Sequence, residues 1–329
     1  MTFKTGPDDS NRRLDRILRK AMPDSPLSFI HRLLRQGQVL VDGKKARPFD
    51  RVPQGALLTV PGDASLCTLK PPLPASNNVQ TSIASSPPLE ILWQGSGLLA
   101  VCKPAGLEVH GPNSLDTQVR HYLASKIGGA HLGGGECSLS FRPGPLHRLD
   151  KPTSGAIVFS TSLAGAQFFS KLLQEGKVRK TYLAIVEGRL EKEEIWQDKI
   201  ARDTAAKKTI VAKDLQSEPD GKMAITRVMP LAFSIGAEKN NYSLVMAEIR
   251  TGKTHQIRAQ AAAHNHPLAG DVKYGGHSDG TPSGKGRLGG NFFLHAWKLE
   301  IEQGVKITAP LPQAFLKKTQ MLFGTFLNF

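Results

Sequence analysis

The sequence predicts an α+β protein with a mainly antiparallel sheet, preceded by a small α/β unit at the N-terminus. Short apolar runs bounded by glycine, proline or charge recur from Leu89 onward, as strands do, and two helical patterns lie between them. Residues 61 to 88 are rich in Pro, Ser and Asn and poor in apolar residues, which is typical of a linker. We therefore expect a basic domain at 1–60, a linker at 61–87 that lets this domain move, and a larger domain at 88–329.

The sequence of the N-terminal unit predicts two helices followed by three strands. Apolar residues recur at helical spacing in NRRLDRILRKAM, with arginines around them. Ser28 is expected to cap the second helix, and Gly37 is expected to end it. The pair Asp42-Gly43 predicts a tight turn between two strands, and ALLTV predicts a third strand.

The larger unit contains at least six predicted strands and two predicted helices. The strands are LEILWQ, LLAVCKP, AIVFST, KTYLAIVEG, YSLVMAEI and WKLEIE, and the helices are SLDTQVRHYLASKI and SLAGAQFFSKLLQEG. The segments 128–136 and 275–290 are rich in glycine and predict loops. Neither has the strand–glycine–helix order that a phosphate-binding P-loop requires.

The charge balance favours a polyanionic partner. The formal net charge is +15 and the cations are clustered, which favours nucleic acid over an anionic membrane, although a positive surface also confers solubility.

No window approaches eighteen apolar residues and the first residues lack an apolar core, so we expect no membrane span or secretory signal. The three cysteines lie 35 residues apart, which matches neither a disulfide framework nor a zinc site. We therefore expect a cytoplasmic protein with reduced thiols.

The stretch RPGPLHRLDKPTSGAIVFS, residues 142 to 160, places one acid, Asp150, among several cations just before an apolar strand. Pro152 and the hydroxyls of Thr153 and Ser154 are expected to make this turn rigid. Nearby cations favour the ionised form of a carboxylate, and an ionised, oriented carboxylate can act as a nucleophile or a base. The ordinary alternative is an aspartate that caps a turn and pairs with an arginine.

Four segments of the larger unit resemble the RluA-type pseudouridine synthases, in the order of that family. HRLDKPTSG, preceded by RPG, resembles the catalytic motif. LLAVCKPAGLEVHG (98–111), KTYLAIVEG (180–188) and EIRTGKTHQIRAQAAAHNHPLAGDVKYG (248–275) resemble the other three, and LHAWKLEI (294–301) fits the closing strand. The resemblance spans about residues 88 to 312. It implies a pseudouridine synthase catalytic domain.

The basic unit resembles an S4-type RNA-binding domain. The similar segments are RRLDRIL, FIHRLLRQGQVLVDG and VPQGALLTV. The resemblance implies that RNA phosphates are contacted by the unit's exposed cations, for which solvated helix faces are the alternative. The predicted RNA-binding residues are Arg12, Arg13, Arg16, Arg32, Arg35, Lys44 and Lys45.

The resemblance to the synthases implies roles for named residues in the isomerisation of uridine in RNA. Asp150 would attack the sugar or abstract a proton from it, and Arg258 would form a salt bridge with Asp150. Tyr182 would stack on the target uracil, and Arg148 would help to hold the flipped nucleotide. The remaining predicted substrate-binding residues are His147, Lys103, Lys253 and His255.

The reaction that the resemblance implies requires no metal and no organic cofactor. We find no metal-ligand pattern, because His264 and His266 lie only two residues apart with no cysteine or acid cluster to match them. We expect a monomer whose partner is RNA, with ribosomal RNA favoured over transfer RNA. Two other readings remain open: an RNA-binding ribosome-assembly factor that has lost its activity, and a glycosidase using Asp150. The glycosidase would need a second carboxylate in a comparable setting.

The chain departs from the family pattern at two positions close to Arg258. Lys253 stands where an arginine is expected, and Gln260 stands where a histidine is usual. Both lie outside the Asp150–Arg258 pair, so we expect them to affect RNA contacts and local packing more than the chemistry.

Overall fold

The computed structural model describes residues 2–22, 25–61, 88–126, 138–203, 208–212, 221–234, 241–277, 292–302 and 304–324, and the backbone of 282–283 and 287–288. The predicted linker after residue 61, the glycine-rich segment 128–136 and most of the segment 275–290 lie outside these residues.

The N-terminal unit packs two helices against a small four-stranded sheet with the order β1-β6-β3-β4, while β2 pairs with β5. Its elements are β1 (Thr2–Lys4), η1 (Pro7–Asp9), β2 (Arg12–Arg13), α1 (Leu14–Ala21), α2 (Leu27–Arg35), β3 (Leu40–Val41), β4 (Lys44–Lys45), β5 (Arg51–Val52) and β6 (Leu57–Thr59). The apolar stripes of both helices form one buried cluster with the strands. This is the arrangement that the helical spacing of the apolar residues predicted.

The ends of α2 and the hairpin test three details of the prediction. The prediction that Ser28 caps α2 is wrong, because Pro26 is the N-cap residue and Ser28 lies inside the helix; proline suits a helix start because its φ is already fixed there. Gly37 does end the helix, with φ +65° and an N–H that donates to Leu34 O. The Asp42-Gly43 turn is confirmed, since both residues have positive φ.

The larger unit is built on an eleven-stranded sheet with the order β13-β12-β14-β15-β11-β18-β10-β8-β7, to which β19 and β9 add at β18 and β10. All of its strand pairs are antiparallel except β10 with β18, which confirms the predicted sheet type. The strands are β7 (Glu90–Gly95), β8 (Leu98–Lys103), β9 (Gly144–Pro145), β10 (Ser154–Ser160), β11 (Val178–Glu187), β12 (Glu194–Asp203), β13 (Lys208–Val211), β14 (Lys222–Phe233), β15 (Tyr242–Ile249), β18 (Leu294–Ile301) and β19 (Val305–Thr308). A separate pair is formed by β16 (Pro282–Ser283) and β17 (Arg287–Leu288).

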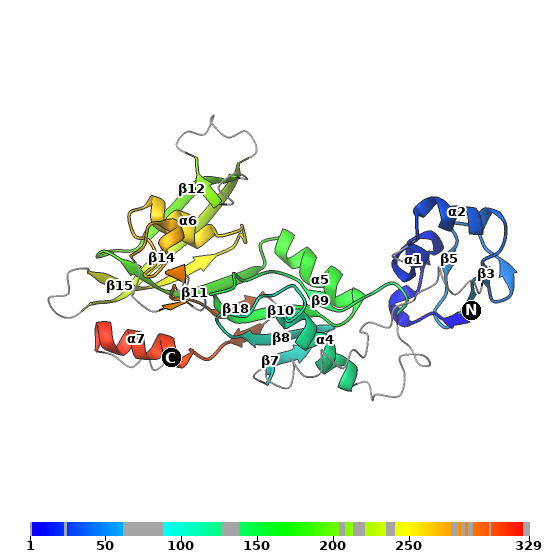
Figure 1. The fold of residues 1–329 in the computed structure, drawn as a ribbon, viewed down its shortest axis with the longest axis horizontal. Coiled ribbons are helices and arrows are strands. Elements are labelled where there is room, and N and C mark those ends of the chain that lie inside the picture. The colour runs from blue at the N-terminus through cyan, green and yellow to red at the C-terminus, as the bar shows by residue number, and fades with distance from the viewer. Residues whose placement is uncertain are drawn as a thin grey trace.

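Helices cover both faces of this sheet (Figure 1). The helices are α4 (Leu115–Lys126), α5 (Leu163–Gln174), α6 (Gln256–Ala263) and α7 (Gln313–Phe323), with the 3-10 turn η2 (Val272–Tyr274) after α6. Residues of α4 and α6 share one buried cluster, whereas α5 and α7 pack in two others. Along β11, Tyr182 and Ala184 belong to the α6 cluster and Leu183 to the α7 cluster, because side chains alternate along a strand. Tyr182 therefore lies on the same face as α6.

Candidate active site

Asp150 lies in the turn that leads into β10. The Thr153 N–H donates to Asp150 O at 3.0 Å and closes the turn. The hydroxyl of Ser154, which we expected to bond the backbone, instead bonds His295 Nδ1 at 2.8 Å. Gly155 (φ +112°) follows, and a Cβ there would lie 2.2 Å from Ala296 O. The close approach of β10 to β18 therefore requires glycine and fixes the strand that carries Asp150.

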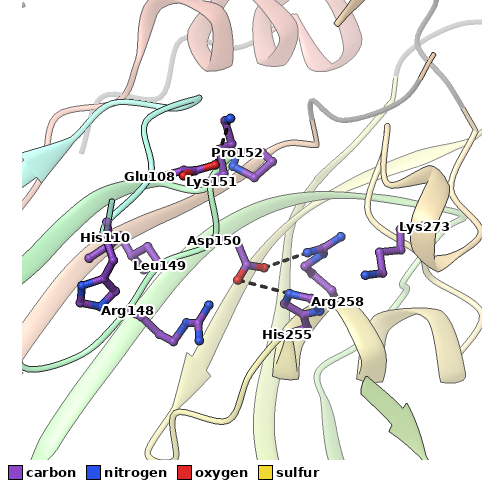
Figure 2. Close-up of a pocket in the computed structure, with 11 residues that line it drawn as sticks. Glu108, His110, Arg148, Leu149, Asp150, Lys151, Pro152, His255, Arg258 and Lys273 are labelled. Atoms are coloured by element: carbon purple, nitrogen blue, oxygen red, sulfur yellow. Dashed lines mark hydrogen bonds and ion pairs between the residues drawn. The ribbon is translucent and has the colours of Figure 1, made fainter. Parts of the chain in front are cut away.

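Arg258 of α6 donates from Nη1 to Asp150 Oδ2 at 2.9 Å (Figure 2). Its other edge is held by Asp271, with Nε–Oδ2 and Nη2–Oδ1 distances of 2.6 and 2.8 Å. The rings of Tyr274 and Phe292 lie 4.8 and 4.3 Å from its guanidinium carbon. Burial alone lowers the pKa of Arg258, but Asp271 and then Asp150 raise it above its ordinary value. The structure thus brings together the predicted pair and adds Asp271, which the sequence analysis did not single out.

His255 approaches the second oxygen of the same carboxylate. Its Nε2 lies 3.6 Å from Asp150 Oδ1, and its Nδ1 lies 2.9 Å from the Tyr274 hydroxyl, which accepts from Thr209 N. Burial lowers the pKa of His255, and Arg258 also lowers it, against the opposing effect of Asp150. The residue has φ +54° at the start of α6, a left-handed conformation that is uncommon for non-glycine residues.

A cavity of about 380 Å³ opens beside these groups. Arg148 is exposed in its wall, and Glu108 pairs with Lys151 at 3.1 Å with both side chains exposed. Figure 2 shows Arg148 and His110 on one side of Asp150, and His255, Arg258 and Lys273 on the other. His110 and Lys273 lie in segments that resemble the family, but we had assigned them no role. The cavity lining consists of Glu108, Val109, His110, Arg148, Leu149, Asp150, Lys151, Pro152, His255, Arg258 and Lys273.

Tyr182 is buried in β11, with 7% of its surface exposed. It lies outside the lining of this cavity. Burial raises its pKa, and the charge of Asp150 raises it further, so its side chain is a neutral phenol near that carboxylate.

Lys103 was predicted to bind substrate, but the structure buries it completely. Its ammonium donates to Pro104 O, Leu107 O and Lys151 O at 3.0, 2.6 and 2.9 Å. Burial lowers its pKa to about 8. All three acceptors are backbone carbonyls, so Lys103 ties the turn after β8 to the residue that follows Asp150 and does not line the cavity.

His147 and Lys253 also lie outside the cavity lining. The Nε2 atom of His147 accepts a hydrogen bond from Val158 N at 3.0 Å, which requires an unprotonated nitrogen. Burial, with a smaller effect of Lys180, lowers the pKa of His147 to about 3. We had predicted that His147 binds substrate, but this hydrogen bond shows that it fixes the approach to β10. Lys253 is half-buried in the loop before α6.

Gln260, which stands where the family usually has a histidine, joins α6 to the sheet. It is fully buried, and its Nε2 donates to Trp196 O, Asp198 Oδ2 and Ala224 O at 2.9, 2.6 and 3.2 Å. Its Oε1 accepts from Thr226 Oγ1 at 2.6 Å. Gln260 thus takes part in local packing.

The predicted RNA-binding residues of the N-terminal unit differ in their surroundings. Arg13 makes two hydrogen bonds to Asp15 at 3.1 and 2.7 Å and stacks on Phe49 at 4.4 Å, so it holds the unit itself together. Arg12 and Arg16 line a groove. The remaining four residues are exposed: Arg32, Arg35, Lys44 and Lys45.

Within the described part of the chain, no group of three or more His, Cys, Asp or Glu side chains is placed to hold a metal ion. None of the described helices has the length and apolar character needed to cross a membrane.

Comparisons with known proteins agree with this geometry. The family described as RNA pseudouridylate synthase matches residues 97–263, and the S4 domain family matches residues 12–58. An uncharacterized RNA pseudouridine synthase of Aquifex aeolicus is 32% identical over 84% of this chain and 80% of its own length. Ribosomal large subunit pseudouridine synthase D of Neisseria meningitidis serogroup A is 29% identical over 91% of this chain and 76% of its own.

A solved structure, human RNA pseudouridylate synthase domain containing 1, superposes with a TM-score of 0.52 and 25% identity, covering 68% of this chain and 84% of that one. The family match covers half of the chain, and a relative above 30% identity is aligned over most of it. The chain belongs to the RNA pseudouridylate synthase family and carries an S4 domain at its N-terminus.

Proposed function

We propose that this enzyme isomerises uridine to pseudouridine in large-subunit ribosomal RNA, with Asp150 as its essential carboxylate. The observation that carries the proposal is the Asp150–Arg258 pair at the wall of a cavity of about 380 Å³, a size within the range of small-molecule sites. The names of two relatives, ribosomal large subunit pseudouridine synthases C and D, support this class of RNA.

In the proposed reaction, Asp150 attacks C1′ of the ribose or abstracts a proton from the sugar. The bond between C1′ and N1 breaks, the uracil turns, and a bond forms between C1′ and C5. The proton on C5 is lost and N1 gains one, so the atomic composition does not change and no redox partner is needed. Because C1′ and the faces of the base are covered in a stacked helix, the nucleotide must leave the stack first.

The position of Arg148 supports the role that the family resemblance implies, whereas the stacking role of Tyr182 on the uracil comes from the resemblance alone. Tyr182 lies close enough to Asp150 for that charge to raise its pKa, but its side chain is buried and lies outside the cavity lining. Arg148 is exposed in the cavity wall, where it can hold the flipped nucleotide through phosphate or occupy the vacated space. His255 places its ring beside the second oxygen of Asp150.

The test compares pseudouridine maps of ribosomal and transfer RNA from cells that contain the wild-type chain, Asp150→Ala or no protein. We expect one or more sites in large-subunit ribosomal RNA to disappear in both altered strains, while purified Asp150→Ala still binds RNA. Glu191→Ala, an exposed acid far along the chain from the cavity lining, is the control that should keep every site. Loss of sites in transfer RNA alone would assign the other substrate. Full modification by Asp150→Ala would refute the assigned carboxylate.

A further inference from the structure

A buried carboxylate joins the N-terminal unit to the catalytic part, residues 88–324. Asp9 has no exposed surface. It accepts hydrogen bonds from Ser138 Oγ at 2.9 Å, Leu139 N at 2.8 Å and Ser140 N at 3.0 Å, in addition to one from its neighbour Gly6 N at 3.0 Å. Hydrogen bonds to a charged acceptor are stronger than neutral ones. The segment before β9 is therefore attached to the N-terminal unit (Figure 1).

Three further contacts extend this junction. Asp8 Oδ1 accepts from Leu163 N at 2.8 Å, at the first residue of α5, where a carboxylate also interacts favourably with the helix dipole. Arg12 Nη1 donates to Ser140 Oγ at 2.6 Å, and Leu139 packs against the apolar core of the N-terminal unit. Although we expected a unit that moves on its linker, the structure shows it docked.

Docking creates a groove of about 980 Å³ along the junction. The N-terminal unit supplies Arg12, Arg16, Arg19 and Lys20, and the catalytic part supplies Arg142. Among the described residues no carboxylate belongs to the lining, which otherwise consists of Ser25, Leu27, Ser140, Phe141 and Leu163. The groove therefore carries five cationic side chains from two parts of the fold.

The positive charge of this groove is not balanced within the described residues. Arg16, Arg19, Lys20 and Arg142 are exposed and form no ion pair there. Arg16 lies three and four residues from Arg19 and Lys20 on α1, a spacing at which like charges destabilise a helix.

The acids of the N-terminal unit that the structure describes are engaged elsewhere. Asp15 pairs with Arg13, Asp42 accepts from Leu57 N, and Asp50 accepts from Arg47 N, while Asp8 and Asp9 form the junction. Such an uncompensated surface suits a polyanion, and exposed arginine and lysine side chains in a groove suit phosphates spaced along a backbone.

We propose that the groove between the N-terminal unit and the catalytic part binds the phosphodiester backbone of an RNA segment that extends beyond the target nucleotide. The docked junction holds this segment at a fixed position relative to Asp150, because β9, which follows Arg142, pairs with Phe159 and Ser160 at the end of β10 opposite the Asp150 turn. The identity of the RNA as substrate rests on the proposed function, but phosphate binding does not.

The test measures the affinity for a fluorescein-labelled RNA hairpin by fluorescence anisotropy over a series of salt concentrations. Arg16→Ala and Arg142→Ala should each weaken binding. The slope of log affinity against log salt is negative, and each variant should reduce its magnitude by about 0.7 to 0.9 for each lost phosphate contact. The matched control is Lys317→Ala, an exposed cation of α7 outside the groove, which should leave the slope unchanged. Slopes for the groove variants equal to that of the control would overturn the proposal.

A second variant tests whether docking makes the groove. Leu139→Glu places a carboxylate beside Asp9 and leaves the sequence of the N-terminal unit intact, so it should separate the two parts without unfolding either. Ser140→Ala, which removes the hydroxyl between Asp9 and Arg12, is the milder alternative if that variant does not fold.

When Arg142→Ala is added to the undocked variant, it should not reduce the magnitude of the salt slope further. A full additional loss would show that Arg142 binds RNA without the junction and would overturn the composite groove. These measurements need no turnover, so an enzyme that binds the hairpin through the groove but makes no pseudouridine would refute the proposed function alone.

Discussion

Replacing Asp271 by asparagine tests whether the position of Arg258 depends on its second acid. Asp271 is 2% exposed and occupies both Nε and Nη2 of Arg258. Asparagine keeps the shape but loses the charge and presents an NH₂ group to one N–H donor. Removing one partner of a buried ion pair costs about 3 to 5 kcal/mol. Because Asp150 still neutralises Arg258, we expect a loss near the lower end, about 3 kcal/mol.

The exposed pair Arg227–Glu193 provides a control with the same geometry. Its two hydrogen bonds are 2.6 and 2.8 Å long, which matches Arg258–Asp271, but its side chains are 47% and 42% exposed. Solvent screens such a pair, so Glu193→Gln should hardly change the free energy of unfolding. Urea unfolding of both variants therefore measures the effect of burial at constant geometry.

Activity gives a second, independent readout. Without Asp271 the guanidinium is free to shift, and a displacement of about 1 Å in a catalytic group can lower the rate on the order of 100-fold. Single-turnover pseudouridine formation at a temperature where both variants are folded should show this loss for Asp271→Asn, with RNA affinity retained. An unchanged rate, together with a destabilisation no greater than that of Glu193→Gln, would refute the positioning role of Asp271.

Three other substitutions test separate features of the catalytic part. Gln260→His should lower the free energy of urea unfolding by about 2 kcal/mol, because imidazole cannot replace an amide that makes four hydrogen bonds; an unchanged value would refute this. Lys103→Met should destabilise by about 2 to 3 kcal/mol, since it removes the donor from the carbonyls of Pro104 and Leu107 and leaves Lys151 O only its bond from Gly106 N, and should slow turnover by loosening the Asp150 turn; normal stability and turnover would contradict this. Burial lowers the pKa of His295 to about 4, so the native state keeps it neutral while the unfolded chain binds a proton below about pH 6.5. The contribution of His295 to stability should therefore fall on acidification from pH 6.5 to 4 by up to about 1.4 kcal/mol per pH unit. His295→Gln should remove this part of the slope in urea titrations at several pH values, while the contribution of His147, whose pKa is about 3, should remain.

Six strands of the sheet were predicted from sequence, whereas β12, β14 and α6 were not. β11 is buried at nearly every position, and its continuous apolar run identifies it. In α6, by contrast, Gln256, Arg258 and Gln260 are all buried and make their hydrogen bonds inside the protein. A helix that buries polar and apolar residues in succession has no apolar stripe to detect.

The site could be located from its motifs, but its internal contacts required the fold. Asp150 and Arg258 are 108 residues apart, and only their resemblance to family motifs paired them. Asp271 contacts Arg258 because the chain reverses its direction tightly after α6. Gly270 has φ +87°, and a Cβ on Gly276 would lie 2.3 Å from Leu268 O. Such a reversal leaves no periodic signal in the sequence.

The junction at Asp9 was missed for a related reason. Acidic residues are mostly exposed, so two adjacent aspartates before a basic helix read as solvated. The donors that bury Asp9 belong to residues 138–140, which follow a glycine-rich segment with no predicted structure. Neither Asp9 nor the segment 138–140 carries a sequence pattern that predicts the contact between them.

The buried polar contacts on both sides of Asp150 divide the site into a fixed part and an adaptable part. Asp271 and two aromatic rings hold Arg258, while Lys103 and the His147 bond to Val158 hold the strand and turn that carry Asp150. The carboxylate and guanidinium are thus oriented before substrate binds, which is the arrangement that stabilises developing charge most effectively. Arg148, exposed in the cavity wall, has no such restraint among the described residues. We therefore expect substitutions of Arg148 to change which RNA is accepted and those behind Asp150 to change the rate.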